Sequence, residues 1–124
     1  MTSLLNQKYN SFKNDEVCLR HILDAAREAV AFCKGRSRTD LDKDRMLNLS
    51  LVRLLEIIGE AARGISEKLR SAHPEIVWKK MVGMRDRLIH GYFDFNLDVV
   101  WETVTQDLPP LIAQLEKLLT SEKA

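Results

Sequence analysis

The sequence predicts an all-α fold, an antiparallel bundle of four principal helices. It leaves open whether there is also a short fifth helix. Apolar residues recur at intervals of three and four along most of the chain, which is the period of a helix with one buried face. Glycine, proline or capping residues separate the periodic stretches, and no stretch alternates apolar and polar residues as a half-buried strand does. Short connections between such helices favour antiparallel neighbours.

Length and composition fit one domain. The chain has 124 residues, of which 45% are hydrophobic and 30% charged, and about two thirds of the unfolded surface can be buried at this size. We place the bundle at residues 15–122 and expect residues 1–14, which show no sustained period, to form a flexible N-terminal arm. Because the sequence has neither a long apolar run nor the layout of a signal peptide, we expect a cytoplasmic protein.

The first predicted helix spans residues 17–34. Its apolar positions form one face: Leu19, Ile22, Leu23, Ala26, Val30 and Cys33. Gly35 is expected to end it. The two cysteines, Cys18 and Cys33, have no further ligand at metal-binding spacing, so we predict free, buried thiols rather than a disulfide or a metal site.

The longest predicted helix begins near Thr39 or at Asp44 and continues to His73, where the following proline ends it. Its apolar positions hold one register over more than six turns: Leu47, Leu51, Leu54, Leu55, Ile58, Ala61, Ala62, Ile65 and Leu69. Gly59 and the two alanines after it are small enough for another backbone to approach closely. We therefore predict that a second helix crosses this one there.

Two further helices complete the predicted bundle. One spans residues 79–90 and ends at Gly91, and the other begins at the capping residue Asn96 and keeps one apolar register to the end of the chain. Pro109 and Pro110 lie within that register. Prolines remove backbone donors, but the register resumes in phase, so we expect a kink or a short break there.

Charged residues gather at the end of the third helix, in the stretch MRDRLIHGY (84–92). Asp86 and His90 are four apart, so the carboxylate can hold one imidazole nitrogen and leave the other for proton transfer. Arg85 and His90 are five apart, about 140° around the helix. They converge on one ligand only if His90 turns back at the helix end or if a second copy packs across a two-fold axis. The alternative is that these charged residues only form a solvated helix end and have no function in binding or catalysis.

An arginine and a histidine without metal ligands suit the cleavage of RNA. The guanidinium can clamp phosphoryl oxygens, the imidazole can move protons, and the 2′-hydroxyl is an internal nucleophile. We therefore expect neither a metal nor another cofactor. The net charge of +1 gives no general affinity for nucleic acid, but Lys79, Lys80 and Arg87 form a local basic cluster with Arg85 that can guide RNA. The alternative is that the lysines are only solvated surface residues.

The segment RDRLIHGY, from Arg85 to Tyr92, resembles the R-x4-H-x-Y motif of HepT toxins, a branch of the HEPN superfamily of all-helical ribonucleases. The stretches on either side look like the family's flanking helices in order and spacing: LLEIIGEAARGISEKLRSAHPEI (54–76) and NLDVVWETVTQDLPPLIAQLEKLL (96–119). The resemblance covers about residues 15–120.

The resemblance implies an HEPN-like homodimer whose paired motifs form a metal-independent endoribonuclease site, with a tRNA or an mRNA as substrate. Arg85 and His90 match the catalytic pair, and Asp86 stands in a supporting position where asparagine is more usual. The resemblance also implies a type VII toxin–antitoxin system, in which an MntA-like nucleotidyltransferase antitoxin neutralises the toxin by adenylylation (AMPylation) of Tyr92. A non-catalytic helical dimer that serves as the binding or substrate partner of a nucleotidyltransferase is the alternative.

Overall fold

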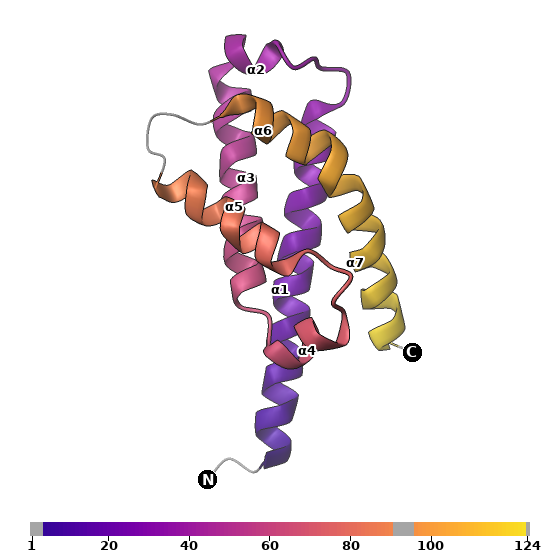
Figure 1. Ribbon diagram of the computed structural model, residues 1–124. Helices are drawn as coiled ribbons and strands as arrows, with labels where there is room; N and C mark the ends of the chain where they lie inside the picture. Colours follow the sequence, from indigo (N-terminus) through magenta and orange to yellow (C-terminus); the bar gives the residue numbers. More distant parts are fainter. Residues whose placement is uncertain (1–3, 91–95, 124) are drawn as a thin grey trace.

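The computed structural model describes residues 4–90 and 96–123, and the side chains of residues 14–88 and 96–121. Within these ranges every regular element is helical, which confirms the all-α class (Figure 1). The elements are α1 Leu4–Cys33, α2 Asp40–Lys43, α3 Arg45–Arg63, α4 Glu67–Ala72, α5 Trp78–His90, α6 Leu97–Glu102, the π-helical segment η1 Thr103–Asp107 and α7 Leu108–Lys123. Helix α1 packs against α3 and α7, and α3 packs against α5. The count of four principal helices and the homodimer stay predictions.

Helix α1 begins at Leu4, so the predicted start at residue 17 was wrong. Residues 4–14 contain no proline or glycine, and Leu5, Tyr9 and Phe12 keep a helical spacing of four and three. Extending an existing helix also costs far less than nucleating one. The end of α1 was predicted correctly. The helix ends at Cys33, and Gly35 adopts a φ of 74°, a left-handed conformation that favours glycine. The division into an arm and a bundle stays a prediction.

Charged side chains hold the turn that leads into α3. Asp44 caps α3 by accepting a hydrogen bond from the N–H of Leu47, which confirms the later of the two predicted starts. Thr39 precedes the short helix α2 without a side-chain capping hydrogen bond. Asp44 also accepts a 2.8 Å hydrogen bond from Arg36, and this contact holds the pKa of the carboxyl below its usual value.

The predicted continuous helix up to His73 was wrong, because α3 ends at Arg63 and a separate helix, α4, follows. Ser66 caps α4, and Asp15 of α1 binds this cap. The Asp15 carboxylate accepts hydrogen bonds from the Ser66 N–H at 2.8 Å and from its hydroxyl at 2.6 Å. The apolar register passes through the break because Ile65 stays in the core, at 2% exposure.

The predicted crossing at the small residues of α3 is confirmed. Helix α5 packs against α3 and runs obliquely across it (Figure 1), and Gly59 is buried in this contact. A Cβ added at Gly59 would lie 2.1 Å from the Cβ of Arg85 and 2.7 Å from the carbonyl oxygen of Met81. Real Cβ atoms do not approach so closely, so any other residue at position 59 would push α5 away.

The remaining helix ends follow their predicted signals. Helix α4 ends before Pro74, and the Asn96 side chain caps α6 by accepting hydrogen bonds from the N–H groups of Asp98 and Val99.

The expected break at the two prolines takes the form of η1. The N–H of Leu108 donates to the carbonyl of Thr103, five residues earlier, which defines a π-helical turn. Pro109 and Pro110 follow at once and have no N–H, so the carbonyls four residues before them lack their usual helical donors. The chain therefore changes its hydrogen-bond register just before the prolines and continues as α7.

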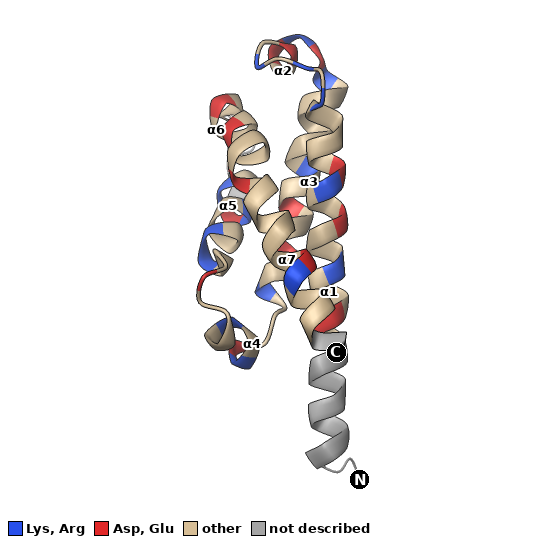
Figure 2. Cartoon of the chain, turned by 90° about the vertical axis from the view of Figure 1, so that its right-hand side faces the viewer, with Lys and Arg blue, Asp and Glu red and all other residues tan. Residues whose placement is uncertain are grey.

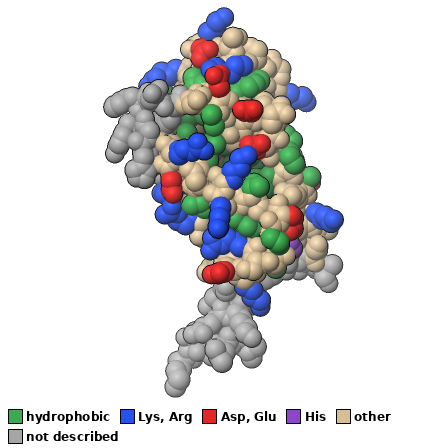
Figure 3. Space-filling model, viewed as in Figure 1, with side chains coloured by type: hydrophobic (Ala, Val, Ile, Leu, Met, Phe, Trp, Pro, Cys, Tyr) green, Lys and Arg blue, Asp and Glu red, His purple; other side chains and the backbone are tan. Residues whose placement is uncertain are grey.

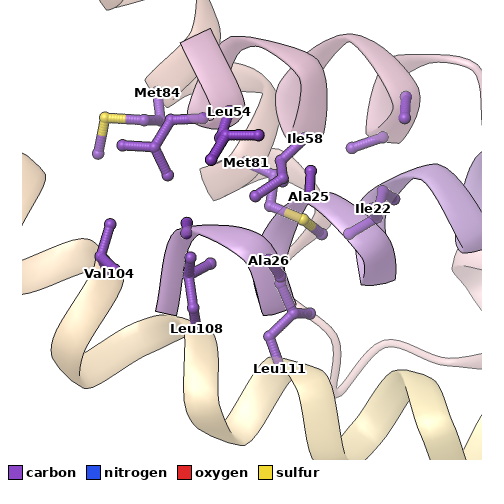
Figure 4. Packing of buried hydrophobic residues seen from close by; sticks show 14 of the residues in the cluster. Ile22, Ala25, Ala26, Leu54, Ile58, Met81, Met84, Val104, Leu108 and Leu111 are labelled. Carbon is purple, nitrogen blue, oxygen red and sulfur yellow. The ribbon is translucent and has the colours of Figure 1, made fainter. Parts of the chain in front are cut away.

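The core lies where α1, α3, α5 and α7 meet, as Figure 4 shows. The largest fully buried side chains are Ile22, Leu41, Leu51, Ile65, Val100, Val104 and Leu115. Each such side chain contributes about 1.5–3 kcal/mol relative to exposure. Lys, Arg, Asp and Glu lie on the outward sides of the helices and around α2 (Figure 2). In the part of the chain that the structure describes, no helix combines the length and apolarity that crossing a membrane requires.

Both cysteines are free thiols, as predicted, but the prediction that both are buried was wrong for Cys18. Cys33 is buried and Cys18 half-buried, and burial raises the pKa of both thiols above the usual value. A raised pKa keeps a thiol protonated at neutral pH, so both cysteines pack as small apolar residues.

Candidate functional site

The predicted site lies at the crossing of α5 and α3. The Cβ and Cγ of Arg85 are seated against Gly59, with no room for a side chain at position 59. The Arg85 side chain is only 23% exposed, and its Nε is buried with no hydrogen-bond partner among the described residues. Packing against α3, rather than a network of hydrogen bonds, therefore fixes the stem of this arginine.

Asp86 binds two guanidinium groups through one oxygen. Its Oδ1 lies 3.2 Å from Nη1 of Arg85 and 2.8 Å from Nη2 of Arg63. Arg63 is the last residue of α3, so this ion pair joins α3 to α5. Arg63 was not predicted as a site residue. Its spacing of four from Gly59, which puts both on one face of α3, is the signal that could have found it.

His90 is the last residue of α5 and follows Asp86 by one helical turn. The His90 side chain, and Tyr92 as a whole, lie outside the described residues. The pairing of Asp86 with the imidazole and the convergence of His90 with Arg85 therefore stay predictions. Because α5 is continuous through His90, the Cα atoms of residues 85 and 90 are separated by about 140° around the helix axis.

The predicted basic cluster is exposed along α5. Lys79, Lys80 and Arg87 all lie at the surface, and Lys80 forms an ion pair with Asp107 of η1 at 3.1 Å. Figure 3 shows Lys and Arg side chains gathered on the face of the molecule where α5 crosses in front of α3. This face carries the positive charge that binding an RNA backbone requires.

A groove between α4 and the start of α5 adjoins this cluster. It is lined by Arg70 of α4 together with Trp78, Lys79 and Lys80. Arg70 was not predicted as part of the cluster, because α4 was expected to be the end of a longer helix. Trp78 is 5% exposed and belongs to the hydrophobic core.

Residues 22–118 match the model of a family described as ribonuclease HepT-like. "Putative RNase TTE0752" of Caldanaerobacter subterraneus subsp. tengcongensis is 41% identical over 105 residues, which cover 85% of this chain and 94% of that protein. "Probable ribonuclease HepT" of Thermococcus cleftensis is 45% identical over 100 residues, which cover 81% of this chain and 91% of that protein. No solved structure matches the chain. The family model matches most of the length of this chain, which shows that the chain belongs to the ribonuclease HepT-like family.

Proposed function

We propose that the chain is a metal-independent endoribonuclease toxin of a type VII toxin–antitoxin system, at work in the cytoplasm. The observation that carries the proposal is the partly buried Arg85, seated at a helix crossing on a basic face in a member of the ribonuclease HepT-like family. A guanidinium held in this way binds the oxygens of a phosphodiester with little loss of side-chain freedom.

In the proposed reaction the 2′-oxygen of one nucleotide attacks its own 3′-phosphorus. The bond from phosphorus to the 5′-oxygen of the next nucleotide breaks, which leaves a 2′,3′-cyclic phosphate and a free 5′-hydroxyl. His90 takes the proton of the 2′-hydroxyl, and the protonated imidazole returns it to the departing 5′-oxygen. Arg85 stabilises the negative charge that builds up on the phosphoryl oxygens, while Asp86 orients the imidazole. The protons balance without a metal ion.

The proposed active form is a homodimer. Helix α5 continues through His90, so the Cα atoms of residues 85 and 90 in one chain lie about 140° apart around the helix axis. Two α5 helices related by a two-fold axis would bring an arginine from one chain and a histidine from the other to the same phosphodiester.

Control is proposed to act on Tyr92. In that step the phenol oxygen of Tyr92 attacks the α-phosphorus of ATP on an MntA-like nucleotidyltransferase, forms a phosphodiester with AMP and releases pyrophosphate. Tyr92 is two residues from His90 in the sequence, so the added phosphate would repel RNA from the site. Mass spectrometry of the protein produced together with a neighbouring nucleotidyltransferase tests this step, and an unmodified Tyr92 in active toxin–antitoxin pairs contradicts it.

Cleavage is tested by incubating the purified protein with total bacterial RNA in the presence of EDTA. The wild type should give fragments that end in 2′,3′-cyclic phosphate, and R85A and H90A should cut at least about 100-fold more slowly. The control is R53A, since Arg53 is an exposed arginine of α3 whose ion partner, Glu56, is on the same helix.

Wild-type protein that cuts no RNA, or R85A that cuts as fast as the wild type, would overturn the proposed activity. Loss of cleavage in EDTA would overturn metal independence alone. Unmodified protein that leaves the RNA intact, combined with adenylylation of Tyr92 when the nucleotidyltransferase is present, would support the alternative, a non-catalytic dimer that is the substrate partner of a nucleotidyltransferase.

A further inference from the structure

Arg63 connects the end of α3 to the middle of α5 through one charged contact. Its Nη2 lies 2.8 Å from Asp86 Oδ1, the oxygen that Arg85 Nη1 approaches at 3.2 Å. Two positive groups from two helices thus share one carboxylate oxygen. The three groups together carry a net charge of +1, next to the basic cluster.

The contact between Arg85 and Asp86 is not one that a helix favours. Neighbouring residues diverge by about 100° around the axis, so their side chains do not face each other. A third group that holds Asp86 in place therefore matters to the geometry. Arg63 is such a group, since it reaches Asp86 from a helix that also seats the Arg85 side-chain stem, its Cβ and Cγ, against Gly59.

Sharing one oxygen also affects how strongly Arg85 is paired with Asp86. An arginine that alone pairs with a carboxylate is largely neutralised as a phosphate ligand, whereas a second cation on the same oxygen weakens that pairing. We infer that Arg63 is a positioning residue of the Arg85 site, which holds Asp86 and keeps the Arg85 guanidinium available for the negative charge that builds up on the phosphoryl oxygens during cleavage. This inference rests on the proposed ribonuclease activity.

Because the Arg63 side chain is 55% exposed, its loss should have a modest effect and leave the fold intact. An exposed ion pair contributes up to about 1 kcal/mol, which corresponds to a rate change of about fivefold. Loss of a positioning residue lowers the cleavage rate of RNA that is already bound and leaves RNA affinity unchanged. Loss of a direct contact from Arg63 to RNA would instead weaken RNA binding and leave the cleavage rate of bound RNA unchanged.

The experiment compares the wild type with R63Q, R63K and R53Q. The probe is a short synthetic RNA that copies the site cut most strongly by the wild type, and the same RNA with a 2′-deoxy nucleotide at that site gives the dissociation constant without cleavage. Single-turnover rates are measured with the protein in saturating excess, at a temperature at which melting curves show every variant folded.

We expect R63Q to lower the saturated rate about fivefold with a dissociation constant within about twofold of wild type. R63K, which keeps a cation without the planar fork, should fall between R63Q and the wild type, and R53Q should match the wild type. Should R63Q fail to fold, R63K gives the same comparison between rate and affinity.

Weaker RNA binding by R63Q with an unchanged saturated rate would overturn the inference in favour of a direct RNA contact. Wild-type rate and affinity in R63Q would also overturn it. R85A is measured in the same assay to separate the inference from the proposed function. If R85A is inactive, the proposed function stands even where the inference about Arg63 fails. If R85A is fully active, the proposed function itself has failed.

Discussion

Gly59 of α3 and Arg85 of α5 meet so closely that a methyl group cannot be placed between them. A Cβ at position 59 would lie 2.1 Å from the Arg85 Cβ. The contact therefore has two consequences, because it sets the distance between two packed helices and it fixes the side-chain stem of the arginine on which the proposed activity depends.

Substituting Gly59 by alanine should lower the free energy of unfolding by about 2–3 kcal/mol, because the atoms that the new methyl meets are a Cβ and a backbone carbonyl, which cannot move without shifting α5. Urea denaturation of G59A measures this loss. Cleavage should fall as well, since Arg85 moves with α5.

The matched control is Gly83, on the same helix as Arg85. An added Cβ there meets no atom within 4 Å, so G83A should be neutral or should stabilise α5 by about 0.5–1 kcal/mol. Equal stability of G59A and G83A would mean that the two helices are not packed as closely as described.

The crossing could be predicted from the sequence because it depends on local composition. Small residues at a helical spacing within an apolar stripe mark a place of close approach, and Gly59 with its alanine neighbours shows this pattern. Gly35, Asp44 and Asn96 were likewise predictable, since each ends or begins a helix through its own backbone or side chain.

The break before Ser66 could not be predicted in this way. The apolar register continues across the break. The hydrogen bonds that fix the break are accepted by Asp15, 51 residues earlier in the chain. The ion pair of Arg63 with Asp86 also spans 23 residues. Contacts of this kind depend on how the helices pack, which periodicity does not encode.

Asp15 should be important for stability because the residue is only 8% exposed and its carboxylate accepts two hydrogen bonds from Ser66. Replacing it by alanine leaves the N–H of the half-buried Ser66 without its acceptor. We expect D15A to lower the free energy of unfolding by about 2 kcal/mol. Asp24 lies exposed on the same helix, and D24A should stay within about 0.5 kcal/mol of wild type. A similar small effect in D15A would contradict a stabilising role for the Asp15 contact.

The turn into α3 should lose stability in acid. The hydrogen bond from Arg36 lowers the pKa of Asp44 in the folded protein, so the unfolded state binds the proton more readily. The stabilisation is therefore complete above the ordinary pKa of aspartate, about 4, and is lost as the pH falls through the lower folded value.

The variant D44N isolates this charge, because asparagine caps helices as well as aspartate does. The wild type should melt at a higher temperature than D44N at neutral pH, and the difference should shrink below about pH 4. A difference in melting temperature that is constant with pH would show that the Asp44 charge does not stabilise the fold.

The basic residues of α5 should differ in their contribution to RNA binding. Lys80 is paired with Asp107 at 3.1 Å, whereas Lys79 is exposed and has no ion pair among the described residues. A lysine that already has a carboxylate partner must give it up, or share it, to bind a phosphate. K79Q should therefore weaken binding of single-stranded RNA more than K80Q does, and should reduce the slope of log Kobs against log salt by about 0.7, the value for one phosphate contact. Fluorescence anisotropy over a salt series measures both quantities.

The control is K117Q, on the exposed side of α7, which should leave affinity and slope unchanged. An equal loss in all three variants would indicate general charge attraction rather than an RNA path along α5.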